Sequence, residues 1–359
     1  MGQRRELAGF TFGAFLISLG AGWIFFNRFP ISLAGFALIL VAGGVIMVLT
    51  SLISWRRSTW WGRGLLSAAG LGIVASLLLS SGATIVQNIV GSGGSVLYTV
   101  QETRMYSGAV TEESVYLKVD NFNGPVTVST WDRMEYSVNV TIRAKDMPMG
   151  NAANNLATFK TSMESGVVSE VRRLVLRYDV PIMFSSVYAV EVRALLPQAT
   201  LGLDLTSSNG GLILSKVSGT SFRLETSNGL LGLDEISVDE LIGSTSNGHI
   251  EGTVNVTKAA LSTSNGAIQL SILGTNSGDY DLKTSNGLIK LTVPSSQNVG
   301  YSLDLSTSNA AVSVGLQGLN YSVDQRTTKK GQTTDFGNKQ IQLTIKGTTS
   351  NGNIDVGTS

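Results

Sequence analysis

The sequence predicts an all-β, right-handed, single-stranded β-helix or solenoid-like domain that is preceded by a three-helix α transmembrane region. Three observations predict this fold class. Long apolar runs occur almost only before residue 91, and a Thr/Ser-Ser-Asn-Gly motif recurs through the C-terminal half of the chain. The residues on both sides of each motif alternate between apolar and polar, which is typical of strands with one buried face.

The composition limits the chemistry that the chain can carry out. Only 14% of the 359 residues are charged and the formal net charge is +1, which gives no indication of nucleic-acid binding. The chain has no cysteine and a single histidine, His249, which we expect to point outward. Disulfides, thiolate metal sites and a cysteine nucleophile are excluded, and a His-based triad or zinc site has no basis. We therefore expect no cofactor.

Three apolar stretches, residues 7–26, 31–53 and 65–90, predict transmembrane helices. Each is close to the ~20 residues that a helix needs to cross a ~30 Å hydrocarbon core. A cleaved signal peptide is the alternative for the first stretch, but its apolar run is long and a second span follows almost at once. The segments expected to be cytoplasmic carry most of the arginines near the spans, namely Arg4, Arg5, Arg56, Arg57 and Arg63. This bias predicts a cytoplasmic N-terminus, an extracytoplasmic C-terminal domain and the lipid bilayer as a partner.

Residues 91–95, Gly-Ser-Gly-Gly-Ser, read as a linker, and the repeats occupy residues 205–359. The motif asparagines recur at intervals of 18 to 23 residues, with a last interval of 42, and an earlier relative surrounds Asn123. Hairpins could also use Asn-Gly turns, but a coil that advances by about 4.8 Å per turn explains why the same corner returns so regularly. The predicted structural corner residues are Asn123, Asn209, Asn228, Asn247, Asn265, Asn286, Asn309 and Asn351.

Several features of these coils follow from the pattern. We expect the asparagines to stack and bond between coils, and the Thr or Ser two places earlier to face inward as a second ladder. The Gly after each Asn would supply a positive φ. The copy at Asn309 has Ala310 instead of Gly, and the excursion 317–341 interrupts the last interval. Because the sequence ends just after the Asn351 corner, we expect that end of the solenoid to be covered by the excursion or by another subunit, as in a homo-oligomer.

Residues 96–204 are less regular and predict the first, irregular β part of the solenoid with a short helix. The segments 115–119, 126–130, 136–144, 171–178 and 188–196 alternate like strands, whereas 152–163 has helical spacing. Terminal units of repeat proteins are commonly atypical, and this region fits that rule.

Candidate sites are few. Counting coils in sequence order places Asp281 and Asp304 on adjacent coils with Asp279 nearby, which is either a Ca²⁺ site or a solvated acidic patch. No catalytic or cofactor-binding residues are identified. The sequons at Asn139, Asn255 and Asn320 are glycosylation candidates if the domain lies outside the cell.

A family resemblance adds to this reading. The run from Leu117 to Val128, followed by Trp131-Asp132, resembles the opening of the putative adhesin family, also called the toast-rack domain. The stretch Ala194–Pro197 and the later Thr-Ser-Asn-Gly copies fit the same family, so the resemblance covers roughly residues 110–359. It implies a single-stranded β-helix-like fold and a role at the cell surface. With membrane helices in front, the architecture is also similar to that of cell-wall-stress sensors.

These observations lead to three hypotheses about function. The first is a membrane-anchored, non-enzymatic surface protein, an adhesin or structural module that contacts a surface glycan or an envelope protein. The second is a cell-envelope stress sensor, or a regulator of a membrane signalling system. The third and most remote is a polysaccharide-active β-helix enzyme, which would need converging carboxylates on one face.

Overall fold

A computed structural model of the chain describes residues 98–146, 151–180 and 187–358. The three expected membrane spans, residues 7–26, 31–53 and 65–90, and the linker 91–95 lie outside the described residues. Within those described ranges, no helix combines the length and the hydropathy that crossing a membrane would require. The chain divides into two compact units, residues 1–97 and 98–359, and every described residue belongs to the second.

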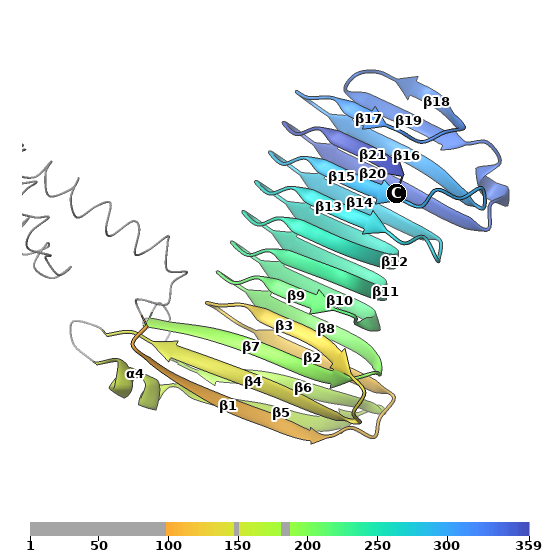
Figure 1. Ribbon diagram of the computed structural model, residues 1–359. Helices are drawn as coiled ribbons and strands as arrows, with labels where there is room; N and C mark the ends of the chain where they lie inside the picture. Colours follow the sequence, from red (N-terminus) through yellow and green to blue (C-terminus); the bar gives the residue numbers. More distant parts are fainter. Residues whose placement is uncertain (1–97, 147–150, 181–186, 359) are drawn as a thin grey trace, which may run out of the picture. The chain divides into compact units, whose positions relative to one another are not determined.

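The second unit consists mostly of strands that stack into two faces, here called face A and face B (Figure 1). Face A contains β2 (Ser114–Asp120), β6 (Val171–Asp179), β8 (Thr200–Ser207), β10 (Ser218–Thr226), β14 (Gly278–Thr284), β16 (Val299–Thr307) and β20 (Ile341–Thr349). Face B contains β3 (Val126–Trp131), β7 (Tyr188–Pro197), β9 (Leu212–Ser215), β13 (Ile268–Ile272), β15 (Ile289–Val293), β17 (Val312–Val314) and β21 (Ile354–Thr358). The long strands β11 (Leu231–Thr245) and β12 (Ile250–Thr263) run from face B into face A.

Each repeat is one coil: a face A strand, an Asn corner, a face B strand and a second bend back to face A. Neighbouring coils pair in parallel with equivalent residues side by side, as in Phe222 beside Leu241 and Thr226 beside Thr245. The apolar positions around each Asn point between the two faces. Leu205 and Leu212, which flank Asn209, are both 0% exposed. The predicted coiling and its buried aliphatic core are therefore confirmed.

The order of the last coils differs from the order in the sequence. The coil of Asn351 does not end the stack, because β20 lies between β14 and β16 and β21 lies between β15 and β17. The coil of Asn309 is outermost instead. The expectation that the Asn351 coil ends the solenoid was wrong, since both of its strands are paired on both sides.

The excursion covers the outermost coil. Its hairpin, β18 (Leu319–Asp324) and β19 (Thr328–Thr333), pairs antiparallel with β16 through β19, and the 3₁₀ helix η3 (Phe336–Asn338) follows. At the tip of this hairpin, the carbonyls of Arg326 and Thr327 accept hydrogen bonds from Val312 and Thr307 at 2.8 and 2.9 Å. The excursion thus covers the coil of Asn309, and not the coil of Asn351 as expected.

The other end of the stack is formed by antiparallel pairs. On face B, β4 (Glu135–Ala144) pairs with β7 and with β1 (Val100–Ala109), and on face A β5 (Lys160–Val168) pairs with β6. The helix α4 (Ala152–Thr158) is preceded by its N-cap residue, Asn151, whose side chain accepts a hydrogen bond from the Asn154 amide at 2.8 Å. It is shorter than the expected 152–163. Phe159 is extended and 1% exposed, and the centroids of its ring and the Tyr188 ring are 4.8 Å apart. The helix therefore ends before Phe159, and β5 follows.

Candidate functional site

The Asn corner forms a continuous ladder of side-chain hydrogen bonds. In each step the Nδ2 atom of one Asn donates to Oδ1 of its spatial neighbour at 2.6 to 2.8 Å. The spatial order of the ladder is Asn209, Asn228, Asn247, Asn265, Asn286, Asn351 and Asn309. The predicted stacking is confirmed for these seven residues, and the ladder places Asn351 before Asn309.

Asn123 does not belong to this ladder, and that part of the prediction was wrong. Its side chain donates instead to the Tyr188 carbonyl at 2.7 Å, on the side of β7, although the coil of Asn209 lies on the other side of this corner. The inward position two residues before the Asn is nevertheless kept in this copy. Asn121 takes the inward place that Thr holds in later copies, is 5% exposed, and bonds to the carbonyls of Gly124 and Val190 at 2.8 Å.

A second ladder lies beneath the asparagines, as expected. The Thr226 hydroxyl accepts from the Gly229 amide of its own coil at 3.1 Å and donates to the Gly210 carbonyl of the preceding coil at 2.9 Å. The same arrangement returns at Thr245, Thr263, Thr284 and Thr349. Because the backbone and hydroxyl groups here already satisfy one another, the corner is mainly a structural element.

The glycine in each corner is required by close packing and not by its φ. A Cβ atom at Gly229 would lie 1.9 Å from the carbonyl oxygen of Gly210, and the other interior corners show the same approach. Among the motif glycines only Gly124, in the corner of Asn123, has a positive φ. The expected conformational reason therefore does not hold for the repeat coils.

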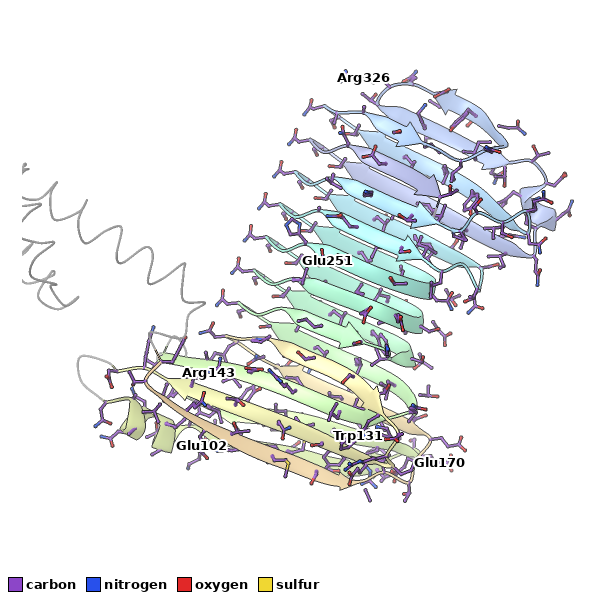
Figure 2. The ribbon with its side chains drawn as sticks, in the orientation of Figure 1. Glu102, Trp131, Arg143, Glu170, Glu251 and Arg326 are labelled. Carbon is purple, nitrogen blue, oxygen red and sulfur yellow. The ribbon has the colours of Figure 1, made fainter. Side chains whose placement is uncertain are left out.

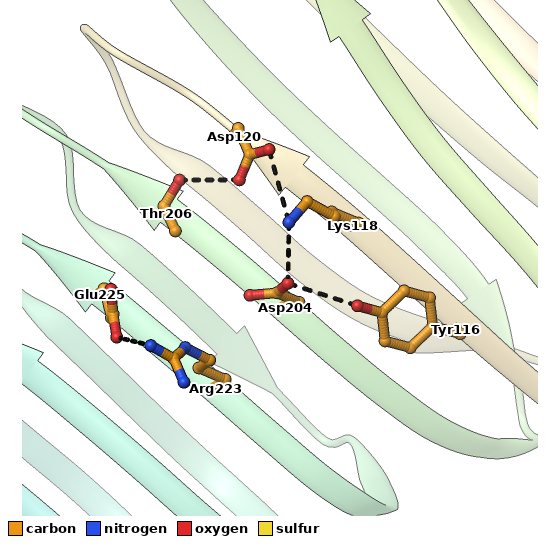
Figure 3. Close-up of polar contacts among 7 residues, drawn as sticks. All are labelled: Tyr116, Lys118, Asp120, Asp204, Thr206, Arg223 and Glu225. Atoms are coloured by element: carbon orange, nitrogen blue, oxygen red, sulfur yellow. Dashed lines mark hydrogen bonds and ion pairs between the residues drawn. The ribbon is translucent and has the colours of Figure 1, made fainter.

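The outer side of face A carries charges that neutralise one another. Figure 3 shows the Lys118 ammonium between Asp204 and Asp120, at 3.1 and 3.6 Å, with the Tyr116 hydroxyl also donating to Asp204. The hydrogen bond to Asp204 and the charges of both carboxylates raise the pKa of Lys118. On the next strand Arg223 pairs with Glu225 at 2.6 Å. These groups are occupied by neighbouring side chains, so this surface offers few free charges.

The expected acidic pair on face A is not formed. Asp281 and Asp304 do not lie on adjacent coils, because β20 runs between them and places Lys346 beside both. Asp281 also pairs with Lys283 at 2.6 Å and Asp304 pairs with Lys330 at 3.1 Å, whereas Asp279 lies beside Thr344. Within the described ranges, no group of three or more His, Cys, Asp or Glu residues is placed to hold a metal ion.

The remaining residues singled out by the sequence lie apart from one another. His249 is exposed, as expected, and its Nδ1 accepts from the Ala267 amide at 2.8 Å. Of the sequon asparagines, Asn320 is exposed, Asn139 is half-buried on β4, and Asn255 is 8% exposed. The folded domain thus presents Asn320 best to a modifying enzyme.

The structure adds a site that the sequence did not indicate. A shallow groove of about 520 Å³, here called the edge groove, runs along the second bend, where the chain passes from face B to face A. Its lining comes from the bends before β2, β8, β10 and β14 and from the middle of β11 and β12, with Met134 from the β3–β4 loop. Its polar lining residues are Glu112, Glu113, Gln198, Thr200, Ser218, Thr220, Ser237, Asp239, Thr257 and Asn276.

Three carboxylates line the edge groove, those of Glu112, Glu113 and Asp239, and only Glu112 is held in an ion pair with a described residue. Glu112 is held by Arg172 in a bidentate pair at 2.9 and 3.0 Å. Desolvation raises the pKa of Glu112, but the hydrogen bonds from Arg172 and from backbone amides outweigh it and keep this pKa below its ordinary value of 4.5. Glu113 and Asp239 are exposed and make no ion pair with any described residue, although Glu240 beside Asp239 pairs with Lys258.

The sequence contained a faint signal for this groove. In the register of the coils Ser218 lies beside Ser237, and Ser237 lies beside Asn255, so small polar residues recur at the bend. The lengths of the second bends vary, however, and these residues hold no constant position relative to the motif asparagines. Only the strand register brings them into one line.

Comparisons with known proteins add limited information. No family model matches the chain, and no curated protein matches it. One similar solved structure is a "putative cell adhesion protein" from Clostridium sporogenes, 12% identical, covering 72% of this chain and 100% of that chain with a TM-score of 0.36. A "putative adhesin" from Bacteroides fragilis is 11% identical, with coverage of 72% and 98% and a TM-score of 0.29. A "putative lipid binding protein" from Parabacteroides distasonis is 12% identical, with coverage of 71% and 96% and a TM-score of 0.29.

These solved structures are thus similar to the described unit over nearly their whole length, but only at low identity and low TM-score. Similarity at this level carries no inference about activity or ligand. The resemblance to the adhesin family, stated above on sequence motifs, remains a prediction.

Proposed function

We propose that residues 98–358 form a non-enzymatic surface module that binds an extended, hydroxyl-rich glycan along the edge groove. One observation carries the proposal. The groove crosses six neighbouring strands, β2, β8, β10, β11, β12 and β14, and each contributes a hydroxyl, amide or carboxylate group. A site of this kind suits a long polar chain better than a compact small molecule.

The dimensions and chemistry of the groove support this ligand class. Five steps of about 4.8 Å between strands give a length of roughly 24 Å, which an extended polymer can follow. Glu113 and Asp239 offer carboxylate oxygens, and Gln198 and Asn276 offer amides, all of which pair well with sugar hydroxyls. The coils beneath are fixed by backbone and Asn ladders, so the lining is already ordered before binding.

The setting of this module is part of the same proposal. The spans at 7–26, 31–53 and 65–90 would anchor it, with the N-terminus in the cytoplasm and the module outside. The arginine bias supports this orientation. We further expect the coils to be right-handed, because connections between parallel strands almost always have that hand.

The first test is glycan binding by the full chain in detergent or nanodiscs. A panel of soluble polysaccharides is titrated, and affinity is compared between the wild type and a Glu113→Gln, Asp239→Asn double variant. We expect at least a tenfold loss of affinity in the double variant, since two charge-assisted hydrogen bonds are each worth about 1.5–3 kcal/mol.

A matched control is Glu251→Gln, because Glu251, which is labelled in Figure 2, is an exposed carboxylate near the start of β12 and does not line the edge groove. This variant should bind as the wild type does. Equal binding by the double variant and the wild type, or loss of sugar polymer through cleavage during the titration, would contradict the proposal.

A further inference from the structure

The inserted coil occupies a defined place, here called the insertion slot, between the coils of Asn286 and Asn309. The slot holds residues Ile341–Thr358 as two strands joined by the Asn351 corner. Both strands pair in parallel on both sides, over most of their length. The slot is therefore a binding site for a strand–corner–strand segment, and in this structure the segment comes from the same chain.

The buried contacts of the slot match this segment closely. Leu343, Ile345 and Ile354 are 0% exposed and continue the aliphatic core of the coils on either side. The Asn351 amide donates to Asn286 at 2.7 Å and Asn351 accepts from Asn309 at 2.6 Å. Core and corner thus define the register of the segment in the slot.

The charges of the slot match the segment as well. On face A, Lys346 lies between Asp281 and Asp304, and on face B, Asp355 lies beside Lys290. Without the segment, Asp281 and Asp304 would keep only their pairs with Lys283 and Lys330 and would lose the cation between them. A slot of this chemistry favours a segment with a cation on one strand and an anion on the other.

A short connection joins the segment to the rest of its chain. The connection from β19 to β20, residues 334–340, is mostly exposed, with Asp335 in the left-handed region at φ 58°. It is held by the Lys339 ammonium on the Gln297 carbonyl at 2.9 Å, by Gln342 on the Gly337 carbonyl at 3.2 Å and by the Thr334 amide on the Gly318 carbonyl at 3.2 Å. The side chains of Phe336 and Lys339 also lie against Gly300 of β16. Seven residues reach at most roughly 24 Å when extended, so the connection can also lead into an adjacent molecule.

The order of synthesis also leaves the slot open to exchange. The coils of Asn286 and Asn309 and the hairpin β18–β19 all precede the segment in the chain, so the segment must enter between elements that are already made. The same segment of a neighbouring chain makes every slot contact equally well, and only the connection changes its path.

We propose that the insertion slot accepts residues 341–358 from a second copy of this chain, so that two copies join by reciprocal exchange of their β20–β21 segments. The partner surface is the slot itself, and no new side-chain contact is needed. Copies held in one membrane would meet at high local concentration, which favours exchange over the monomer.

The test uses the absence of natural cysteine in the chain. Two differently tagged full-length chains are co-expressed, one with Ser306→Cys and the other with Thr348→Cys. These residues are register partners on β16 and β20, at the spacing of adjacent parallel strands, which a disulfide can bridge. After mild oxidation, exchanged molecules form a disulfide between the two tags, which a non-reducing gel detects.

The control pair is Ser244→Cys with Thr348→Cys. Ser244 lies in the same outward column but pairs with Ser262, and Lys283 on the following coil lies between Ser262 and Thr348. We expect the first pair to give at least a fivefold excess of cross-linked dimer over this control. A chain that carries both Ser306→Cys and Thr348→Cys reports insertion within one molecule.

Two outcomes would overturn the proposal. One is an internal disulfide in the doubly substituted chain with no excess of dimer between tags, which would show that the slot is filled only by its own chain. The other is no disulfide in either case, which would show that β20 does not lie beside β16.

Discussion

At the residue scale, the corner glycine is the residue on which the stack depends most directly. Each interior corner brings two backbones so close that a single Cβ would meet the neighbouring carbonyl, at 1.7 to 1.9 Å for Gly248, Gly266, Gly287 and Gly352 as well as Gly229. The exception is Ala310. Its coil is outermost, so a further Asn corner lies on only one side of it, and the tip of the β18–β19 hairpin lies on the other.

Replacing an interior glycine should therefore be costly. We expect Gly229→Ala to lower the free energy of unfolding by about 1–3 kcal/mol, because the coils must separate locally to admit one methyl group. Chemical denaturation followed by circular dichroism measures this change.

The matched control is Ala310→Gly, which should change the free energy of unfolding by less than about 1 kcal/mol, mainly through backbone entropy. Equal and small effects at both positions would show that the corners are not closely packed in solution.

At the element scale, β20 separates carboxylates that would otherwise face each other. Lys346 lies between Asp281 and Asp304, so opposite charges alternate along face A at the place where the chain order is inverted. Opposite charges on paired strands stabilise a sheet, and like charges destabilise it.

Reversing this charge should weaken the inserted strand. We expect Lys346→Asp to destabilise the domain by on the order of 1 kcal/mol, and Lys346→Ala by less, because three carboxylates in a row repel one another. The difference between the two variants should shrink at ~1 M salt. A difference that is independent of salt would assign the effect to packing instead of charge.

The ion pair between Glu112 and Arg172 joins the bend before β2 to β6 in the first part of the stack. The pKa of Glu112 is lowered in the folded state, so its pairing stabilises the fold above pH 4.5 and is lost as the pH falls through the lowered pKa. We expect Glu112→Gln to reduce the fall in Tm between about pH 5 and pH 3. A Tm profile of Glu112→Gln equal to that of the wild type over this pH range would contradict this assignment.

At the scale of the whole molecule, the parallel stack is closed by antiparallel elements at both ends. The pairs β1–β4 and β5–β6 close one end, and the hairpin β18–β19 closes the other on face A. Such elements keep the regular coils from presenting a template for further parallel pairing. The second bends of the coils between these ends line the edge groove.

The sequence by itself determined the coil. Alternation around each Asn predicted which residues are buried, and the fixed offset between Thr, Asn and Gly predicted both ladders, because each of these depends on neighbours a few residues away. Strands 115–119, 126–130, 136–144, 171–178 and 188–196 correspond to β2, β3, β4, β6 and β7 for the same reason. β1, β5 and the end of α4 were missed, since their surroundings come from distant residues.

Only the tertiary structure decided the order of the coils and the site. The apolar positions after the corner follow the same pattern in the Asn309 and Asn351 copies, and this pattern does not place either copy next to Asn286. The separation of Asp281 from Asp304 emerges only once the coils are stacked. The edge groove likewise forms only where the pairing of strands brings residues from several coils side by side. The place of each coil in the stack depends on backbone pairing between residues far apart in the chain. Short-range periodicity does not determine this pairing.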